Sequence, residues 1–337
     1  MKSLTARAAD GSPLTPDEIA QACDDLLDEN QDVAARADFL HALHQRGESP
    51  EEIAEFVNIL LARATPFPAA AGDMIDVCGT GGDRAGLFNV STAVMFVVAA
   101  CGVRVVKHGN RGITSKSGGA DVLEALGVRV DLPPDRAASA LESAGCCFLF
   151  APNYHPAFRA VAPVRKLLAE RGSTSLFNML GPLLNPARPA FQLAGVFDPG
   201  LLDVYARVFQ LLERRSAWAV HGEPGLDEIS PLGTTEVVAW QDAGVRRFSI
   251  HPSEIGINNI SPGDLAGGTA AENAGTIADV LAGNLRHGAR TIVQLNAAAA
   301  LVVAGKAADL SAGWSLAGDA LDSGAARDAL ARLRAAR

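Results

Sequence analysis

From residue 74 onward the chain alternates between short apolar runs typical of strands and longer runs with helical periodicity. We predict strands at 74–79, 103–109, 128–132, 146–152, 191–197, 216–222, 234–240 and 245–252. We predict helices at 90–102, 117–127, 133–145, 155–172, 200–215, 271–283, 291–305 and 325–337. Strands that alternate with helices indicate an α/β fold with a mostly parallel sheet covered on both faces. Some of the later strands follow one another directly and are expected to be antiparallel.

The first 65 or so residues show helical periodicity without strand signals. Thr15 and Ser49 each precede a proline and an acidic turn, which is the pattern of a helix N-cap. The segment 65–73, TPFPAAAGD, then interrupts the helical pattern. With 337 residues, the chain is long enough for one large domain or two ordinary ones.

Composition excludes several classes of protein. The net charge is −9 and no run of Lys or Arg occurs, which argues against a nucleic-acid partner. The five cysteines form no CxxC pair, so we expect reduced thiols and no zinc site. The N-terminus lacks the apolar core of a signal peptide, and no apolar run approaches the ~20 residues of a membrane span. We therefore expect a cytoplasmic protein without membrane association.

The stretch 76–102 places four glycines within eight residues, between a predicted strand and a predicted helix. It matches neither GxxxxGK[ST] nor GxGxxG. A strand, a glycine turn and a helix start nevertheless present several backbone N–H groups to an anion. Asn89, Ser91 and Thr92 stand at the helix start, where they could cap the helix or contact phosphate or metal. The plainer alternative is an ordinary connection with an N-cap.

The segment 107–121 also follows a strand and precedes a helix. It carries four basic side chains in an acidic protein: Lys107, His108, Arg111 and Lys116. Open α/β sheets bind ligands at the carboxyl ends of their strands, so this segment is a second candidate anion site. A solvated loop, with His108 as a structural histidine, is the alternative.

Two further segments carry candidate ligands. Asp227 and Glu228 lie in a Gly/Pro loop, and such carboxylates suit Mg²⁺ bound together with substrate phosphates. An exposed acidic turn is the alternative. Arg165 could pair with a substrate carboxylate, although a surface arginine is the commoner case. On one straight helix, Arg165 and His155 would face nearly opposite directions.

These elements, in this order, resemble the anthranilate phosphoribosyltransferase family over nearly the whole chain. The matching motifs are GTGGD (79–83), NVST (89–92), KHGNR (107–111), SGGAD (117–121), HPA (155–157), FNMLGPLLNP (177–186) and GLDE (225–228). The segments GGTAAENA, near residue 270, and LNAAAALVVAGKA match as well.

The resemblance implies a small all-α N-terminal domain and a larger α/β domain with a central, mostly parallel sheet, as in nucleoside phosphorylases and related phosphoribosyltransferases. It implies a helical domain over 1–70, with a helical excursion around 165–185. The α/β domain then covers 74–164 and 186–337. The active site is expected in the cleft between the two domains, and a homodimer is expected to form through the helical domain.

The resemblance also implies a reaction, in which the amino group of anthranilate attacks C1 of phosphoribosyl pyrophosphate and pyrophosphate leaves. The product belongs to tryptophan biosynthesis, and the cofactor is Mg²⁺. The nucleophile is already an uncharged aromatic amine, so no acid or base residue is assigned. Positioning and charge stabilisation should carry the rate.

By the same resemblance, each substrate has its own set of residues. Those implied for phosphoribosyl pyrophosphate are Gly79, Gly82, Asp83, Asn89, Val90, Ser91, Thr92, Lys107, Ser115 and Gly119. Those implied for anthranilate are Gly79, His108, Asn110, His155 and Arg165. Those implied for Mg²⁺ are Ser91, Asp227 and Glu228.

The sequence departs from the family pattern at three places. Leu87 stands where most members have Thr or Ser, Gly119 replaces the usual Ser or Ala, and the segment 169–176 lacks the usual Arg-Thr. Two other interpretations are a pyrimidine-nucleoside phosphorylase and a non-catalytic relative that binds nucleic acid. The first should carry a KHSTGG-type segment instead of KHGNR, and the second should lose the acidic pair and gain basic surface.

Overall fold

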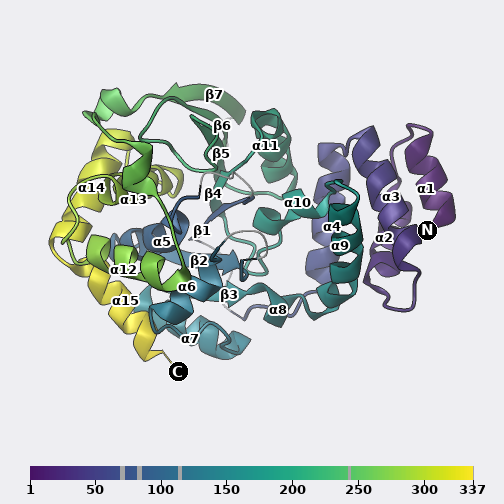
Figure 1. The fold of residues 1–337 in the computed structure, drawn as a ribbon, viewed down its shortest axis with the longest axis horizontal. Coiled ribbons are helices and arrows are strands. Elements are labelled where there is room, and N and C mark those ends of the chain that lie inside the picture. The colour runs from purple at the N-terminus through teal and green to yellow at the C-terminus, as the bar shows by residue number, and fades with distance from the viewer. Residues whose placement is uncertain (69–72, 82–85, 113–115, 242–243, 337) are drawn as a thin grey trace.

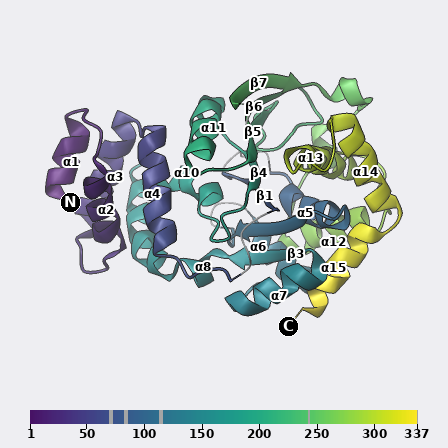
Figure 2. The ribbon, with the colours of Figure 1, turned by 180° about the vertical axis from the view of Figure 1, so that it is seen from behind.

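The computed structural model describes residues 1–68, 73–81, 86–112, 116–241 and 244–336. A helical bundle lies at one end and an α/β body at the other, and the view from behind shows the same division (Figures 1 and 2). The bundle consists of α1 (Lys2–Ala9), α2 (Pro16–Leu27), α3 (Val33–Arg46) and α4 (Pro50–Ala62), joined by α9 (Ala162–Glu170) from later in the chain. Helix α9 packs against α3.

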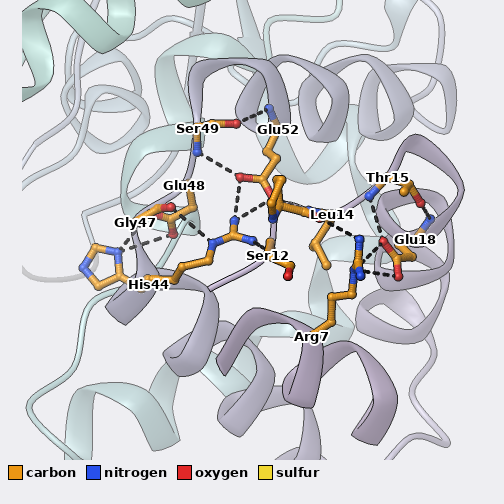
Figure 3. A network of polar contacts seen from close by, with 12 residues as sticks. Arg7, Ser12, Leu14, Thr15, Glu18, His44, Gly47, Glu48, Ser49 and Glu52 are labelled. Carbon is orange, nitrogen blue, oxygen red and sulfur yellow. Dashed lines mark hydrogen bonds and ion pairs between the residues drawn. The ribbon is translucent and has the colours of Figure 1, made fainter. Parts of the chain in front are cut away.

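Both predicted N-caps of the bundle are confirmed. Thr15 and Ser49 accept hydrogen bonds from the backbone N–H groups of Glu18 and Glu52, and both glutamates close a capping box. Figure 3 shows Glu52 also reaching the backbone N–H of Leu14, at 2.8 Å. Arg46 pairs with the same carboxylate at 2.6 Å. The buried charge of Glu52 is thus satisfied and joins the α1–α2 connection to the α3–α4 turn.

Within the described residues the strands form one seven-stranded sheet in the order β3-β2-β1-β4-β5-β6-β7. Strands β3, β2, β1, β4 and β5 are parallel, and β6 and β7 are antiparallel, as predicted. The strands are β1 (Met74–Gly79), β2 (Arg104–Gly109), β3 (Cys146–Phe150), β4 (Phe191–Gly195), β5 (Ser216–Gly222), β6 (Thr235–Gln241) and β7 (Gly244–Ile250).

The strand predicted at 128–132 is wrong. Its side chains do alternate between buried and exposed, with Val128, Val130 and Leu132 turned inward. The segment nevertheless joins no strand of the sheet. The alternation therefore reports a half-buried extended segment rather than a hydrogen-bonded strand.

Helices cover the sheet on both sides (Figure 1). Besides α9, the helices that follow β1 in the chain are α5 (Val90–Ala100), α6 (Gly119–Ala125), α7 (Pro134–Ala144), α8 (Ala151–Tyr154), α10 (Phe177–Leu180), α11 (Leu202–Leu211), α12 (Ala270–Leu281), α13 (Ala289–Val303), α14 (Leu310–Asp322) and α15 (Ala325–Ala335). The 3-10 helices are η1 (Pro156–Val161), η2 (Gly181–Leu183), η3 (Pro199–Leu201), η4 (Pro252–Ile255) and η5 (Pro262–Leu265). The helix α14 was missing from the sequence prediction.

The single straight helix predicted at 155–172 is also wrong. The segment divides into η1, which starts after His155, and α9, which carries Arg165. Prolines at 156 and 163 lie in the first turns of these two helices, where their missing N–H groups cost nothing. The argument that His155 and Arg165 point to opposite sides of one helix therefore fails.

Two hydrophobic clusters meet at the sheet. In β5, Trp218 and Val220 belong to the cluster shared with α5 and α13, whereas Ala217 and Ala219 belong to the cluster shared with α11 and the helical bundle. The small side chains on the second face let Phe209 of α11 pack closely against the strand. The bundle is therefore held to the sheet by a continuous apolar core.

Among the described residues, none of the helices is long and apolar enough to span a lipid bilayer.

Candidate active site

The candidate site starts at the carboxyl end of β1, where the glycine turn begins. Because β1 lies between β2 and β4 and all three run parallel, the turns that follow these strands share one edge of the sheet. The N–H of Thr80 donates to the carbonyl of Gly195 at 2.9 Å, and the N–H of Gly81 donates to Oδ2 of Asp227 at 2.8 Å. The glycine turn is thus fixed to the edge of β4 and to the acidic loop.

Asp227 passes close to two strands, over a glycine in each. A Cβ on Gly79 would lie 2.4 Å from Oδ2 of Asp227, and a Cβ on Gly195 would lie 1.6 Å from its carbonyl oxygen. Gly195 therefore requires glycine, because a Cβ there would strike the backbone of Asp227, whereas a Cβ on Gly79 would displace the Asp227 carboxylate. The next residue, Glu228, lines one small cavity together with Ser91. The structure therefore brings the three predicted metal ligands to the same edge of the sheet.

Lys107 lies in β2 and is almost fully buried. Its ammonium donates to the carbonyl of Val77 at 2.8 Å and to Oγ of Ser91 at 3.1 Å. The predicted cation therefore lies at the start of α5, where the helix dipole and the N–H groups already favour an anion.

The buried carboxylate of Asp76 provides an opposite charge near Lys107. Asp76 of β1 is inaccessible to solvent and accepts a hydrogen bond from the amide of Asn185 at 2.8 Å. Burial raises the pKa of the Asp76 carboxyl to about 6, against the opposing charge of Lys107 and the hydrogen bond from Asn185. Asn185 also donates to the carbonyl of Val106 at 2.7 Å. Neither Asp76 nor Asn185 was predicted, although both lie in or beside matching motifs.

The helix start contains Asn89, Val90 and Thr92. Asn89 is the N-cap residue of α5 but makes no side-chain capping bond. Its amide bridges to the next loop instead: it donates to the carbonyl of Ser117 at 3.2 Å and accepts from the Ser117 hydroxyl at 2.9 Å. Val90 and Thr92 are buried in the first turn. The two candidate anion loops are thus joined by side chains.

Gly119 opens α6 close to this helix start. A Cβ at Gly119 would lie 3.5 Å from Oγ1 of Thr92 and 3.9 Å from Cε of Lys107, which are ordinary contact distances. Gly118 differs, because a Cβ there would lie 2.2 Å from the backbone nitrogen of Gly112. Only Gly118 is therefore required by close packing, and the departure at Gly119 leaves room for the family's usual Ala or Ser.

The predicted basic residue Arg111 is engaged elsewhere. Its guanidinium pairs with Asp121 at 3.1 Å and with Glu124 at 2.6 Å, and it lies over the ring of Phe150. These pairs fix the loop onto α6. The structure therefore explains Arg111 as a loop anchor, whereas Lys107 lies at the helix start.

Two of the residues predicted for the aromatic substrate, His108 and His155, belong to a row of rings that leads to the core of the helical bundle. The rings of His108 and His155 meet edge to face with centroids 5.4 Å apart, and Phe158 and Phe177 extend the aromatic row. His155 donates from Nε2 to the carbonyl of Leu184 at 2.8 Å, if that nitrogen carries the proton. Burial lowers the pKa of His108 to about 3 and also lowers the pKa of His155. Both rings are therefore neutral near pH 7.

Asn110 and Arg165 are exposed. Arg165, on α9, makes no hydrogen bond or ion pair with another described residue, so its guanidinium is available to a ligand. Partial desolvation lowers the pKa of Arg165, but guanidinium titrates far above neutrality and Arg165 stays charged.

Three of the residues predicted for phosphoribosyl pyrophosphate, Gly82, Asp83 and Ser115, lie outside the described residues. Leu87 pairs with Ala266 in an isolated antiparallel bridge and packs against the core.

Comparison with models of known protein families shows the broad class to which the chain belongs. The chain matches the glycosyl transferase family in two parts, its helical bundle domain over residues 2–64 and its a/b domain over residues 71–327. The fold is thus that of a glycosyl transferase with a helical bundle domain.

Individual relatives narrow the class. Anthranilate phosphoribosyltransferase of Methylorubrum extorquens strain PA1 is 47% identical over 332 residues, covering 98% of this chain and 97% of the relative. That of Methylobacterium radiotolerans is 49% identical over 328 residues, covering 97% and 94%. The chain therefore belongs to the anthranilate phosphoribosyltransferase family.

Solved structures agree with this assignment. The anthranilate phosphoribosyltransferase of Thermus thermophilus is 39% identical and superposes with a TM-score of 0.91, with 98% of each chain covered. The Saccharomyces cerevisiae enzyme, solved in complex with phosphoribosyl pyrophosphate and Mg, is 26% identical with a TM-score of 0.89, covering 99% and 96%.

The contrast between the two neighbouring glycines gives a stability test. We expect Gly119→Ala to leave the free energy of unfolding unchanged or raise it by about 0.5 kcal/mol, because the methyl group fits and the unfolded chain loses freedom. We expect Gly118→Ala to lower it by about 1–3 kcal/mol, because backbone must move. Urea unfolding of both variants measures the difference, and equal stability of the two would contradict this packing.

Proposed function

We propose that this protein transfers the phosphoribosyl group of 5-phosphoribosyl 1-pyrophosphate to the amino group of anthranilate, with Mg²⁺. Pyrophosphate is released, and the product is N-(5-phosphoribosyl)anthranilate, an intermediate of tryptophan biosynthesis. The family assignment supports the reaction. The observation of this structure that carries the proposal is the passage of Asp227 over Gly79, which brings the acidic pair to the glycine turn and the helix start.

The diphosphate is proposed to bind where the loops after β1 and β2 meet. Backbone N–H groups at the start of α5 and the ammonium of Lys107 offer donors and positive charge to it. The proposed contacts also include Gly79, Asn89 and Gly119. Such preorganised groups stabilise the negative charge that grows on the departing pyrophosphate.

The residues present fit a magnesium ion shared with substrate phosphates. Ser91, Asp227 and Glu228 offer only oxygen donors, which Mg²⁺ prefers. Among the described residues, no group of three or more His, Cys, Asp or Glu side chains could hold a metal. Phosphate oxygens of the substrate would therefore have to complete the coordination. When bound, Mg²⁺ neutralises charge on the leaving group.

Anthranilate is proposed to bind on the bundle side, with Arg165 toward its carboxylate and Asn110 as a hydrogen-bonding group. The neutral rings of His108 and His155 offer an uncharged aromatic surface at that side. We assign neither ring a role in proton transfer, because the amine attacks without prior deprotonation. Holding the amine against C1 is then the main task of these residues.

The remaining assignments are also proposals. We infer a homodimer formed through the helical bundle, a cytoplasmic location, and a division of the chain into 1–70 with the excursion at 165–185 against 74–164 with 186–337. A boundary near residue 70 is supported by the family's helical bundle domain, which matches residues 2–64, and its a/b domain, which matches residues 71–327. The bundle's core nevertheless continues into one face of the sheet, so the two parts share packing.

The acidic pair provides the test of this function. The protein is expected to consume anthranilate, followed by its fluorescence, when phosphoribosyl pyrophosphate and Mg²⁺ are present. We expect Asp227→Asn combined with Glu228→Gln to lower kcat by about 100-fold or more and to abolish the response to Mg²⁺. The control is Asp203→Asn, because Asp203 is an exposed carboxylate paired with Arg247. Absence of turnover by the unaltered protein would refute the proposed function, and an unchanged Mg²⁺ response in the double variant would refute the metal assignment.

The substrate carboxylate gives a separate test. We expect Arg165→Ala to raise the KM for anthranilate by about 10- to 100-fold, because a charged hydrogen bond is lost, while the KM for phosphoribosyl pyrophosphate changes little. Arg159→Ala is the matched control, since this nearby exposed arginine pairs with Glu29. Steady-state kinetics in both substrates measure the two effects, and equal increases of the two KM values would contradict the role of Arg165.

A further inference from the structure

Three chain segments meet at one buried side chain, that of Asn273. It belongs to the first turns of α12 and is only 3% exposed. Its neighbours are Asn89 at the start of α5, Ser117 in the loop before α6, and Gly268 in the loop before α12 itself. Helix α12 packs on both α5 and α6, so Asn273 lies where the two candidate anion loops come together.

Backbone groups fix the orientation of both amides. The N–H of Gly268 donates to Oδ1 of Asn273 at 2.7 Å, so the other end of this amide must be its NH₂ group. That nitrogen donates to Oδ1 of Asn89 at 3.0 Å and to Oγ of Ser117 at 3.4 Å. The Asn89 amide is fixed in the same way, because its nitrogen faces the carbonyl of Ser117. With the hydroxyl of Ser117 donating to Oδ1 of Asn89, the three side chains close a ring of hydrogen bonds.

The ring has a consequence for Asn89. Its carbonyl oxygen accepts two hydrogen bonds and its nitrogen already donates one. One N–H remains for a ligand. The Asn89 side chain therefore serves mainly to connect the loops.

The helix α12 does not need the Asn273 side chain for its own start. Thr269 and Glu272 form a complete capping box there. Asparagine is also a poor helix former, and burying an amide is costly unless every polar atom is satisfied. The hydrogen bonds that the Asn273 side chain makes to Gly268, Asn89 and Ser117 thus explain its presence in the helix.

We propose that Asn273 is a positioning residue, which holds the loop entering α5 and the loop entering α6 at the spacing that a bound pyrophosphate group requires. It contacts the loops and acts through them. The inference rests on the proposed function, because it assumes that both loops face one phosphorylated ligand. A small displacement of such loops weakens every contact to that ligand at once.

The test compares Asn273→Ala, Ser117→Ala, the double variant and Asn284→Ala. Asn284 is the matched control, since it is exposed beyond the far end of α12 and bonds to Asp279. We expect each ring variant to raise the KM for phosphoribosyl pyrophosphate about tenfold, through loss of hydrogen bonds, with the KM for anthranilate within about twofold of the unaltered protein. The double variant should be little worse than either single one, because both break the same ring.

Calorimetric titration with magnesium pyrophosphate repeats the test without turnover. We expect about tenfold weaker binding for the ring variants, through the same lost hydrogen bonds, and no change for Asn284→Ala. This readout separates the two proposals, because an unaltered protein without turnover refutes the proposed function while pyrophosphate affinity still reports on the loops. Unchanged KM and affinity, a lower kcat with both KM values unchanged, or additive effects in the double variant would each overturn the positioning role.

Discussion

The site depends on one steric constraint, which is the close passage of the acidic loop over two strands. The backbone of Asp227 lies so close to Gly195 that no side chain fits there, and its carboxylate occupies the space that a side chain at Gly79 would need. Its carboxylate then accepts the N–H of Gly81 and fixes the start of the glycine turn. Because β1 and β4 are neighbours, this single contact aligns the acidic pair with the helix start on the adjoining turn.

A buried polar layer below this edge connects the two sides of the site. Asn185 joins Asp76 to the backbone of β2, and it belongs to the segment 177–186, which also carries Phe177 of the aromatic row. Gln192 of β4 donates to the carbonyl of Pro182 in the same segment, and Arg214 donates to Gln192 at 3.3 Å. Buried charges of this kind are stable only with their partners present. The same buried hydrogen-bond network therefore lies beneath both the proposed diphosphate site and the proposed anthranilate site.

Much of this architecture could be predicted from sequence. The period of the apolar residues identified the strands of the sheet, and the structure brings Gly79, Lys107 and Asp227, which the resemblance implied for one site, to the same edge. Strand pairing and side-chain contacts were harder to predict from the sequence, because they depend on residues far apart in the chain. The segment 128–132 alternates like a strand but has no strand to pair with, and prolines divide 155–172 into two helices.

The functional residues that the sequence analysis missed also depend on contacts between distant parts of the chain. Asn273 and Asn185 both lie in segments that resemble the family, yet a single asparagine carries no signal of its partners. Their roles emerge only when strands and helices distant in sequence bring loops together, 184 residues apart in the case of Asn273 and Asn89. Arg111 is the converse case, since its charge suggested a ligand and its neighbours on α6 already use it.

The central claim is that the acidic loop and the start of α5 form one metal and pyrophosphate site. The most direct measurement is the anomalous diffraction of a crystal of the protein grown with Mn²⁺ and pyrophosphate. The account predicts a manganese peak between the pyrophosphate and the carboxylates of Asp227 and Glu228, next to Ser91. A bound pyrophosphate whose manganese lies away from both carboxylates would contradict it.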